Sequence, residues 1–293
     1  MNTETQTQRK PVTDIEQKQG GSTMKVAIIG HTGMGGKMLT DILTERGHQV
    51  TGLSAHAEKV PSREGLNSIS CDVFNVDDLA EKLKGHDVVV SCFSGGHAVD
   101  MGVYYRQIEG TRCIIKAFKK SKCDYIIYIG GAASLFVLPD NKTMMEDPRF
   151  PRWYYGIMPP VHLRWLGDIT GESFFYDAAE RKESGKVAMN ASDPELEECV
   201  KDWTSVPLLE GCRAALDLFE GKYDFQWSFL SPPWFYRPGE GTGEYTLGVD
   251  YMLFENGVPT GISVPDLQLA VADEVERQNL IHKHWTCAGR QEK

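Results

Sequence analysis

Short runs of apolar residues alternate along the chain with segments whose apolar residues recur every three or four positions. The first run, Lys25 to Ile29, is continuous and rich in β-branched residues, which is typical of a strand buried on both faces of a parallel sheet. Helical spacing follows from Met38 to Leu43, and Gly47 provides a stop. Comparable runs predict later strands at Gln49 to Leu53, Ser68 to Val73, His86 to Cys92, Asp124 to Ile129, Gln226 to Leu230 and His284 to Cys287.

Helix signals fill the gaps between these strands, with Asn75 and Ser263 as caps at two of the helix starts. Strands that alternate with helices over this length predict an α/β fold with a doubly wound parallel sheet. The expected helices run from about Val76 to Lys84, Tyr104 to Lys120, Pro194 to Glu220 with a break at Pro207, and Ser263 to Arg277. Two short runs, Tyr245 to Gly248 and Met252 to Phe254, are expected to form a small peripheral hairpin.

Three glycines, Gly30, Gly33 and Gly36, stand between the first strand and the first helix in a GxxGxxG array. In this position the N–H groups at the start of a helix can receive a pyrophosphate, and a Cβ atom would hold that phosphate away. Glycine-rich turns also join strands to helices in sheets that bind nothing. The strand before the array and the helix after it favour a nucleotide site over a purely structural turn.

The regular alternation stops between Pro139 and about Glu195. This stretch carries six prolines and a series of aromatic residues with little helical or strand periodicity. A long irregular segment inside a compact domain is often a functional lid, and this one leaves the sheet at the carboxyl end of a strand, where ligands bind. The alternative is that its aromatic side chains form a satellite core that never contacts substrate. We expect a lid over an apolar or aromatic substrate.

Composition narrows the function further. The chain has 293 residues, a formal net charge of −10, 41% hydrophobic residues and 25% charged residues. The negative charge argues against a nucleic-acid partner, and no apolar run approaches the length of a membrane span. Seven scattered cysteines without a CxxC pair indicate reduced thiols, hence a cytoplasmic protein with no metal site. Residues 1–23 are polar and are expected to be a disordered tail.

Several stretches resemble the atypical short-chain dehydrogenase/reductases, in particular NAD(P)-binding proteins such as the proposed NADH-flavin reductases and the NmrA-like and biliverdin reductase B-like proteins. The matching pieces are KVAIIGHTGMGG, the Asp72-Val73 pair, YIIYIGGAASL, FLSPPWFYRPGEGTGEYTLGVD and GISVPDLQLAVADEVE. The resemblance implies a Rossmann-like fold. Residues 24–138 and 222–288 would form the NAD(P)-binding domain with a small C-terminal substrate-side subdomain, and residues 139–221 an inserted lid or substrate-side region.

The resemblance also implies which residues contact a nicotinamide dinucleotide. Ser54 would face the adenosine ribose, and Asp72 with Val73 would flank the adenine. The pyrophosphate would be held by Gly30, Thr32, Gly33, Met34, Gly35 and Gly36. The nicotinamide half would be lined by Cys92, Phe93, Ser94, Gly130 and Gly131, and closed over by Ser231, Pro232 and Pro233.

The chain departs from that family at the catalytic centre. Classical members use a Tyr-x-x-x-Lys pair to exchange a proton with the substrate oxygen, and no tyrosine here has a lysine four residues on. The serine that classical members carry after the fifth strand corresponds to Gly131 in this chain. Ser134 is a possible substitute, although it is displaced by three positions. Candidates for a proton donor are therefore Tyr155, Tyr154, His162 and Ser134.

These features predict an NAD(P)H-dependent oxidoreductase that transfers a hydride to a conjugated or aromatic small molecule of secondary metabolism. Proximity to the cofactor would then supply most of the catalysis. The alternatives are a non-redox isomerase, epimerase or dehydratase, and an NADP-sensing regulator of the NmrA type. NADP is expected rather than NAD, because no carboxylate follows the second strand between Leu53 and Ala57. Whether the chain forms a homo-oligomer stays open.

Overall fold

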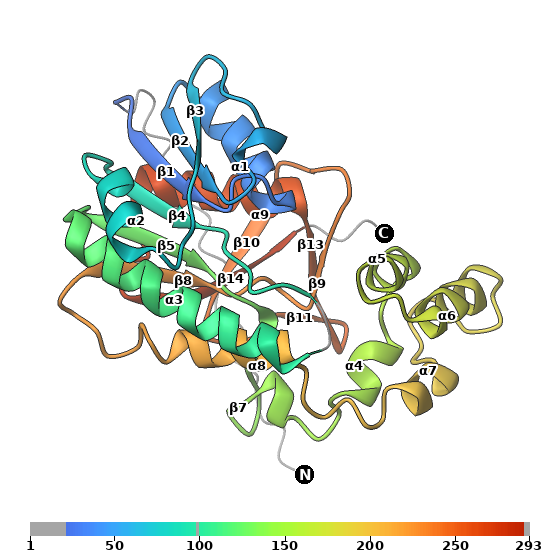
Figure 1. The fold of residues 1–293 in the computed structure, drawn as a ribbon. Coiled ribbons are helices and arrows are strands. Elements are labelled where there is room, and N and C mark those ends of the chain that lie inside the picture. Colours follow the sequence, from blue (N-terminus) through green and yellow to red (C-terminus); the bar gives the residue numbers. More distant parts are fainter. Residues whose placement is uncertain (1–21, 98–99, 290–293) are drawn as a thin grey trace, which may run out of the picture.

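The computed structural model describes residues 22–97 and 100–289, so the expected tail at residues 1–23 lies almost wholly outside the described part. An eight-stranded sheet forms the centre of the molecule, in the order β10-β14-β8-β5-β4-β1-β2-β3. Seven of these strands run parallel, and β10 pairs antiparallel with β14. The predicted doubly wound α/β fold is confirmed (Figure 1).

The strands of the central sheet are short and mostly apolar, and most of them coincide with the apolar runs of the sequence. They comprise β1 Lys25–Ile29, β2 Gln49–Ser54, β3 Leu66–Ser70, β4 Val88–Ser91, β5 Tyr125–Ile129, β8 Gln226–Leu230, β10 Tyr245–Val249 and β14 Lys283–Gly289. In β1, Val26 and Ile28 face one side of the sheet, while Ala27 and Ile29 face the other. Both faces are buried, so both pairs contribute to stability.

Helices cover the two faces of the sheet. On one face α1 Met34–Glu45 packs against α9 Val264–Arg277, over the core that contains Leu39 and Val271. On the other face lie α2 Val76–Leu83, α3 Met101–Ser121 and α8 Pro207–Leu216, over the core that contains Phe118 and Phe219. Figure 1 shows these two layers on either side of the strands.

The boundaries of most elements agree with the sequence patterns. The Asn75 side chain accepts a hydrogen bond from the Asp78 N–H, and Ser263 accepts one from the Asp266 N–H, so both predicted caps are confirmed. The expected long helix after Pro194 does break, since α7 Pro194–Cys199 ends well before α8 begins at Pro207.

Two strand predictions were wrong. The third strand, expected at Ser68 to Val73, starts and ends earlier, at Leu66–Ser70. The expected peripheral hairpin does not form, because β10 joins the main sheet beside β14 and the next short strand, β11 Phe254–Glu255, pairs with β12 Val258–Pro259. Five-residue runs carry too little information to choose a partner almost forty residues away, and the pairing is decided by the whole sheet.

The segment after Pro139 is not irregular, which corrects the sequence expectation. It contains α4 Arg152–Gly156, α5 Pro160–Thr170, α6 Ser173–Glu183 and α7. Figure 1 shows this group of helices to one side of the sheet. Its aromatic and aliphatic side chains fill a third core between the helices, with Tyr154, Leu163, Phe175 and Leu196 fully buried. Because they point inward from several short helices, no single helical period is visible in the sequence.

Short elements connect these parts. The small strand pairs are β6 Phe136–Val137 with β7 Lys142–Thr143, and β9 Phe235–Arg237 with β13 Gly261–Ser263. Single 3-10 turns are η1 Ala57–Lys59, η2 Ala132–Ser134 and η3 Met144–Glu146. Trp234, just before β9, donates a hydrogen bond from its ring N–H to the Tyr154 carbonyl (2.7 Å). This bond ties the helical group to the loop after β8.

Candidate active site

A cavity of about 350 Å³ lies at the edge of the sheet where parallel strands end. One side of its wall comes from the glycine turn before α1 and from the loops that follow β4, β5 and β8. The opposite side comes from α4, α5, the start of α8 and the segment before it. The cavity therefore joins the nucleotide-binding edge of a doubly wound sheet to the helical group.

The glycine turn leaves the start of α1 open toward this cavity. Gly30 has a positive φ of 81°, and a Cβ atom there would lie 2.8 Å from the Cys92 carbonyl oxygen. A Cβ atom on Gly36 would collide with the carbonyl of Gly30. By contrast, a Cβ on Gly33 meets only the Gly30 oxygen, at 3.4 Å. Gly33 caps α1 without a side chain, so the first turn keeps N–H groups for an anion.

The end of β2 is tied to the glycine turn by hydroxyl groups. The Thr32 and Ser54 side chains share a hydrogen bond of 2.8 Å, and Ser54 also accepts the N–H of His56 (3.2 Å). Neither Thr32 nor Ser54 lines the cavity itself. No carboxylate follows β2 until Glu58, which pairs with His56 on the exposed loop.

His31, at a position usually held by a small residue, is completely buried. Its ring occupies the space left by the missing side chain of Gly52, and its Nε2 lies 2.7 Å from the Ser68 hydroxyl oxygen. Burial lowers the pKa of His31, so the ring is neutral near pH 7. His31 therefore supports the turn between β1, β2 and β3.

The predicted adenine end lies beside the loop after β3. The Asp72 carboxylate accepts the N–H of Phe74 (3.0 Å), which holds the loop in place. The Phe74 ring is 43% exposed and meets the Phe93 ring edge to face, with 6.3 Å between centroids. Phe93 lines the cavity, whereas Asp72 and Val73 do not.

Eleven of the predicted cofactor residues come together in the cavity wall: Gly33, Met34, Gly35, Gly36, Cys92, Phe93, Ser94, Gly130, Gly131, Pro232 and Pro233. Burial raises the pKa of the Cys92 thiol to about 12, so this side chain stays protonated and is not a nucleophile. Six others lie outside the wall: Gly30, Thr32, Ser54, Asp72, Val73 and Ser231. Ser231 turns away, with its hydroxyl 2.9 Å from His284 Nε2.

Two of the predicted proton donors, Tyr155 and His162, face the cavity. The Tyr155 hydroxyl makes no hydrogen bond within the described residues, although its ring packs against Trp234 and Phe175. Burial, with a smaller contribution from the positive charge of Arg237, lowers the pKa of His162 to about 3. His162 is therefore a neutral imidazole near pH 7, and its Nδ1 has no partner among the described residues.

The other two candidates lie outside the cavity. The Tyr154 hydroxyl donates to the Asp147 carboxylate (3.0 Å), which also binds Arg149. The Ser134 hydroxyl donates to the Cys212 carbonyl (3.2 Å) and is buried. Both groups are already used in holding the fold together. The structure thus gives Tyr154 and Ser134 structural contacts in place of the expected catalytic position.

Sequence reasoning missed several residues of the wall. Tyr236 and Gln268 lie next to the glycine turn, although they come from the C-terminal part of the chain. Both belong to stretches that carried the family resemblance, FLSPPWFYRPGEGTGEYTLGVD and GISVPDLQLAVADEVE, but no local spacing marked them. Apolar side chains complete the helical side: Met158, Trp165, Leu166, Ile169, Trp203, Val206, Leu208, Leu209 and Trp234.

The neutral state of His162 gives the protein a pH-dependent stability. As the pH falls below 6.5, the unfolded chain protonates this side chain and the folded protein does not until about pH 3. The free energy of unfolding should therefore fall on acidification by up to about 1.4 kcal/mol per pH unit from this group. Urea unfolding of His162→Leu should show a shallower dependence between about pH 7 and about pH 5.

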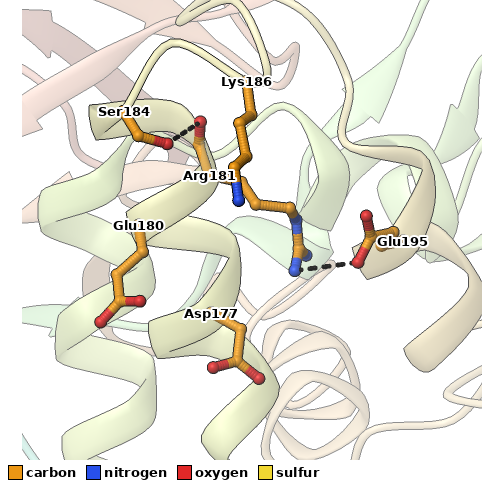
Figure 2. A pocket seen from close by; sticks show the side chains of 6 residues that line it. All are labelled: Asp177, Glu180, Arg181, Ser184, Lys186 and Glu195. Atoms are coloured by element: carbon orange, nitrogen blue, oxygen red, sulfur yellow. Dashed lines mark hydrogen bonds and ion pairs between the residues drawn. The ribbon is translucent and has the colours of Figure 1, made fainter.

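A second hollow, of about 410 Å³, lies between α6 and α7 and is lined by charged side chains. Figure 2 shows Arg181 directed toward Glu195 at the start of α7. The same guanidinium also binds the buried Asp193 carboxylate (2.9 Å). Its cation is thus already paired, and the hollow is remote from the glycine turn, so it is not the candidate active site.

Comparison with known proteins supports the assignment of the first cavity as a nucleotide site. Residues 30–156 match the NAD(P)H-binding family. YwnB of Bacillus subtilis (strain 168), an uncharacterized protein, is 27% identical over 271 residues, which cover 92% of this chain and 100% of YwnB. The L-arabinose 1-dehydrogenase (NAD(P)(+)) of Haloferax volcanii is 31% identical over 148 residues, or 45% of this chain and 56% of that protein.

Solved structures share the fold over nearly the whole chain. A proposed epimerase from Bacteroides thetaiotaomicron superposes with a TM-score of 0.68 at 24% identity, covering 92% of this chain and 99% of that one. A proposed NADH-flavin reductase from Streptococcus pneumoniae TIGR4 has a TM-score of 0.61 at 21% identity, with 91% and 100% covered. The chain therefore has a Rossmann-like fold, and the match of residues 30–156 to the NAD(P)H-binding family supports a nicotinamide cofactor. Both findings support the expected resemblance to the atypical short-chain dehydrogenase/reductases.

Within residues 22–97 and 100–289, no three His, Cys, Asp or Glu side chains come together as metal ligands. Nor does any helix within the same range have the length and apolar character needed to cross a membrane.

Proposed function

We propose that this protein is an NADPH-dependent reductase that transfers a hydride to a conjugated or aromatic small molecule. The observation that carries the proposal is the single cavity that runs from the glycine turn to an aromatic wall. A reductase needs its cofactor and its acceptor side by side. One cavity lined by the glycine turn on one side and by aromatic side chains on the other provides that proximity.

The residues present fit a nicotinamide dinucleotide. The space above Gly33, which a Cβ atom would fill, and the uncapped first turn of α1 suit a pyrophosphate. Cys92, Gly130 and Pro232 line the part of the wall where the nicotinamide half would lie. When bound, the cofactor supplies the hydride. The chain itself holds the nucleotide, excludes water with apolar side chains and offers a proton to the reduced product.

The acceptor side of the cavity favours a flat, apolar substrate. Trp165, Trp203 and Trp234 provide broad ring surfaces, and Tyr155 and His162 are the polar groups among them that the proposal uses. No carboxylate side chain lines this cavity within the described residues. An aromatic wall with few polar groups binds planar compounds such as quinones, enones or flavins better than sugars.

Tyr155 is the proposed proton donor to the substrate oxygen. Its hydroxyl has no competing hydrogen bond in the described residues and lies in the wall of the cavity. Tyr155→Phe removes only that hydroxyl, so it should reduce kcat by about 10²-fold with little change in the affinity for NADPH. Steady-state kinetics and a nucleotide titration of the same variant measure the two effects.

Tyr154→Phe is the matched control, since its hydroxyl binds Asp147 outside the cavity. It should lower thermal stability and change kcat less than Tyr155→Phe does. Equal turnover in wild type and Tyr155→Phe would remove Tyr155 from the mechanism.

NADPH is proposed over NADH because the loop after β2 offers no carboxylate to the ribose 2′-hydroxyl. Ser54 stands at the end of β2, and the carboxylates of the following loop, Glu58 and Glu64, come four and ten residues later. A 2′-phosphate would therefore meet hydroxyl, imidazole and backbone groups without a directly repelling carboxylate.

The activity can be tested with purified protein, NADPH and a panel of quinones, flavins and enones. The proposal predicts acceptor-dependent oxidation of NADPH by at least one planar class. If no member of the panel is reduced although NADPH binds, the reductase assignment fails.

A second candidate is a non-redox isomerase or epimerase, favoured by one observation. Tyr155 and His162, two groups able to exchange a proton, face the same cavity. Such an enzyme would form product with no net consumption of NADPH, and would incorporate deuterium from heavy water at the isomerised carbon.

A further inference from the structure

Gln268 is a buried side chain with an unused hydrogen-bonding atom in the wall of the cavity. It lies on α9 and is only 1% exposed. Its Nε2 donates to the Tyr236 hydroxyl oxygen over a long 3.4 Å, while its Oε1 has no partner among the described residues. An unpaired buried acceptor costs free energy, so a ligand that donates to it would recover that cost.

Gln268 and Tyr236 lie directly beside the glycine turn. A Cβ atom on Gly35 would lie 2.7 Å from Gln268 Nε2 and 3.1 Å from the Tyr236 hydroxyl oxygen. Gly35 therefore keeps its neighbours close to the start of α1, where the pyrophosphate is expected. Two residues from the C-terminal part of the chain thus complete a site that begins near its N-terminal end.

The neighbouring elements indicate on which side of the glycine turn the pair lies. Tyr236 is on β9, three residues after Pro233, so it adjoins the loop that follows β8, whereas the predicted adenosine contacts come from the loops after β2 and β3. Pro232 and Pro233 also line the cavity. The pair therefore lies on the side of the pyrophosphate that leads to the nicotinamide half.

We propose that Gln268 and Tyr236 bind the ribose hydroxyls of the nicotinamide half of the cofactor, an assignment that rests on the proposed function. A ribose hydroxyl can donate to Gln268 Oε1. The Tyr236 hydroxyl, whose oxygen accepts from Gln268 Nε2, keeps its own proton to donate to a second ribose oxygen. Phosphate oxygens offer no donor at neutral pH, so in the amide orientation that the structure shows a phosphate alone would leave Gln268 Oε1 unpaired.

The inference can be tested by calorimetric titration with ADP and ADP-ribose, two ligands that differ by the second ribose. In the wild type, ADP-ribose should bind about tenfold more tightly than ADP, the value of one to two hydrogen bonds. In Gln268→Leu this ratio should fall to about one, while the affinity for ADP stays within about twofold. Tyr236→Phe should reduce the ratio in the same direction.

Thermal unfolding without ligand gives a second measurement, which separates a ligand-binding role of Gln268 from a structural one. A side chain that only stabilised the fold would lower Tm when it is replaced. Gln268→Leu removes an unpaired buried acceptor, so its Tm should equal or exceed that of the wild type. Gln107 is the matched control, because its amide is satisfied by the Gly95 N–H (2.7 Å) and the Tyr128 hydroxyl (3.0 Å). Gln107→Leu should therefore lower Tm.

The outcomes separate this inference from the proposed function. A Gln268→Leu variant that keeps the full ADP-ribose advantage, or that loses affinity for ADP and ADP-ribose equally, overturns the ribose assignment and leaves the reductase proposal standing. A wild-type protein that binds neither ligand nor NADPH overturns both.

Discussion

Gly33→Val should abolish nucleotide binding while the protein stays folded. The nearest atom to a Cβ at Gly33 is the Gly30 carbonyl oxygen at 3.4 Å, an ordinary contact, and Gly33 has a negative φ of −75°, so a Cβ atom fits there without backbone strain. The space that valine fills is the one in front of the first turn of α1, where the pyrophosphate is expected. We expect the affinity for NADPH to fall by about 100-fold or more, with a nearly native circular dichroism spectrum.

Gly36→Val is the matched control within the same turn. Its Cβ atom would collide with the backbone of Gly30 and His31, so this variant should lose thermal stability as well as binding. If Gly33→Val bound NADPH as tightly as the wild type, the glycine turn would serve the fold alone.

Phe175→Ala should destabilise the protein by about 3–5 kcal/mol. Phe175 is fully buried in the core of the helical group, where its ring lies 5.8 Å from Trp203 and 6.0 Å from Tyr155 between centroids. Removing it leaves a cavity that the surrounding rings cannot close. Urea unfolding followed by tryptophan fluorescence measures the loss.

Phe174→Ala provides the comparison, because the neighbouring ring is only half-buried. Its cost should be clearly smaller than that of Phe175→Ala. Equal and small costs for both variants would mean that the segment is a loosely packed lid, as its sequence suggested, and not a core.

Local signals were sufficient for most of the nucleotide half of the fold, although the bounds of β3 were missed. The strand β1 was expected at Lys25 to Ile29 and lies there, because a continuous β-branched run admits few other structures. The helix α9 begins after its Ser263 cap and ends at Arg277, as expected. The strand β10 also lies where it was expected, but its predicted hairpin partner was wrong, because its pairing with β14 depends on residues far away in the chain.

The same distinction applies to the site. Gly33, Met34, Gly35 and Gly36 carry a recognisable local pattern, and the structure places all four in the cavity wall. Gln268, by contrast, has no pattern around it that marks a ligand. Its place beside the glycine turn depends on the packing of α9 against α1, which no local pattern predicts.

For the segment after Pro139, the sequence predicted aromatic residues near the substrate, but it did not predict the helices that carry them. Its aromatic residues were expected near the nicotinamide, and Tyr155 and Trp165 do line the cavity, together with the candidate proton donor His162. Others of the same series, including Tyr154 and Phe175, pack inside the helical group. Aromatic content alone cannot separate these two uses, because each depends on which way a short helix faces.

A calorimetric titration of the wild-type protein with NADPH and with NADH tests the central claim most directly. One cavity joins the glycine turn to the aromatic wall, and no carboxylate stands between Leu53 and Ala57, at the end of β2, to bind an unphosphorylated ribose. We therefore expect one nucleotide per chain, with NADPH bound more tightly than NADH. Absence of binding by both nucleotides would contradict the assignment of the cavity, and tighter binding of NADH would contradict the preference for NADPH.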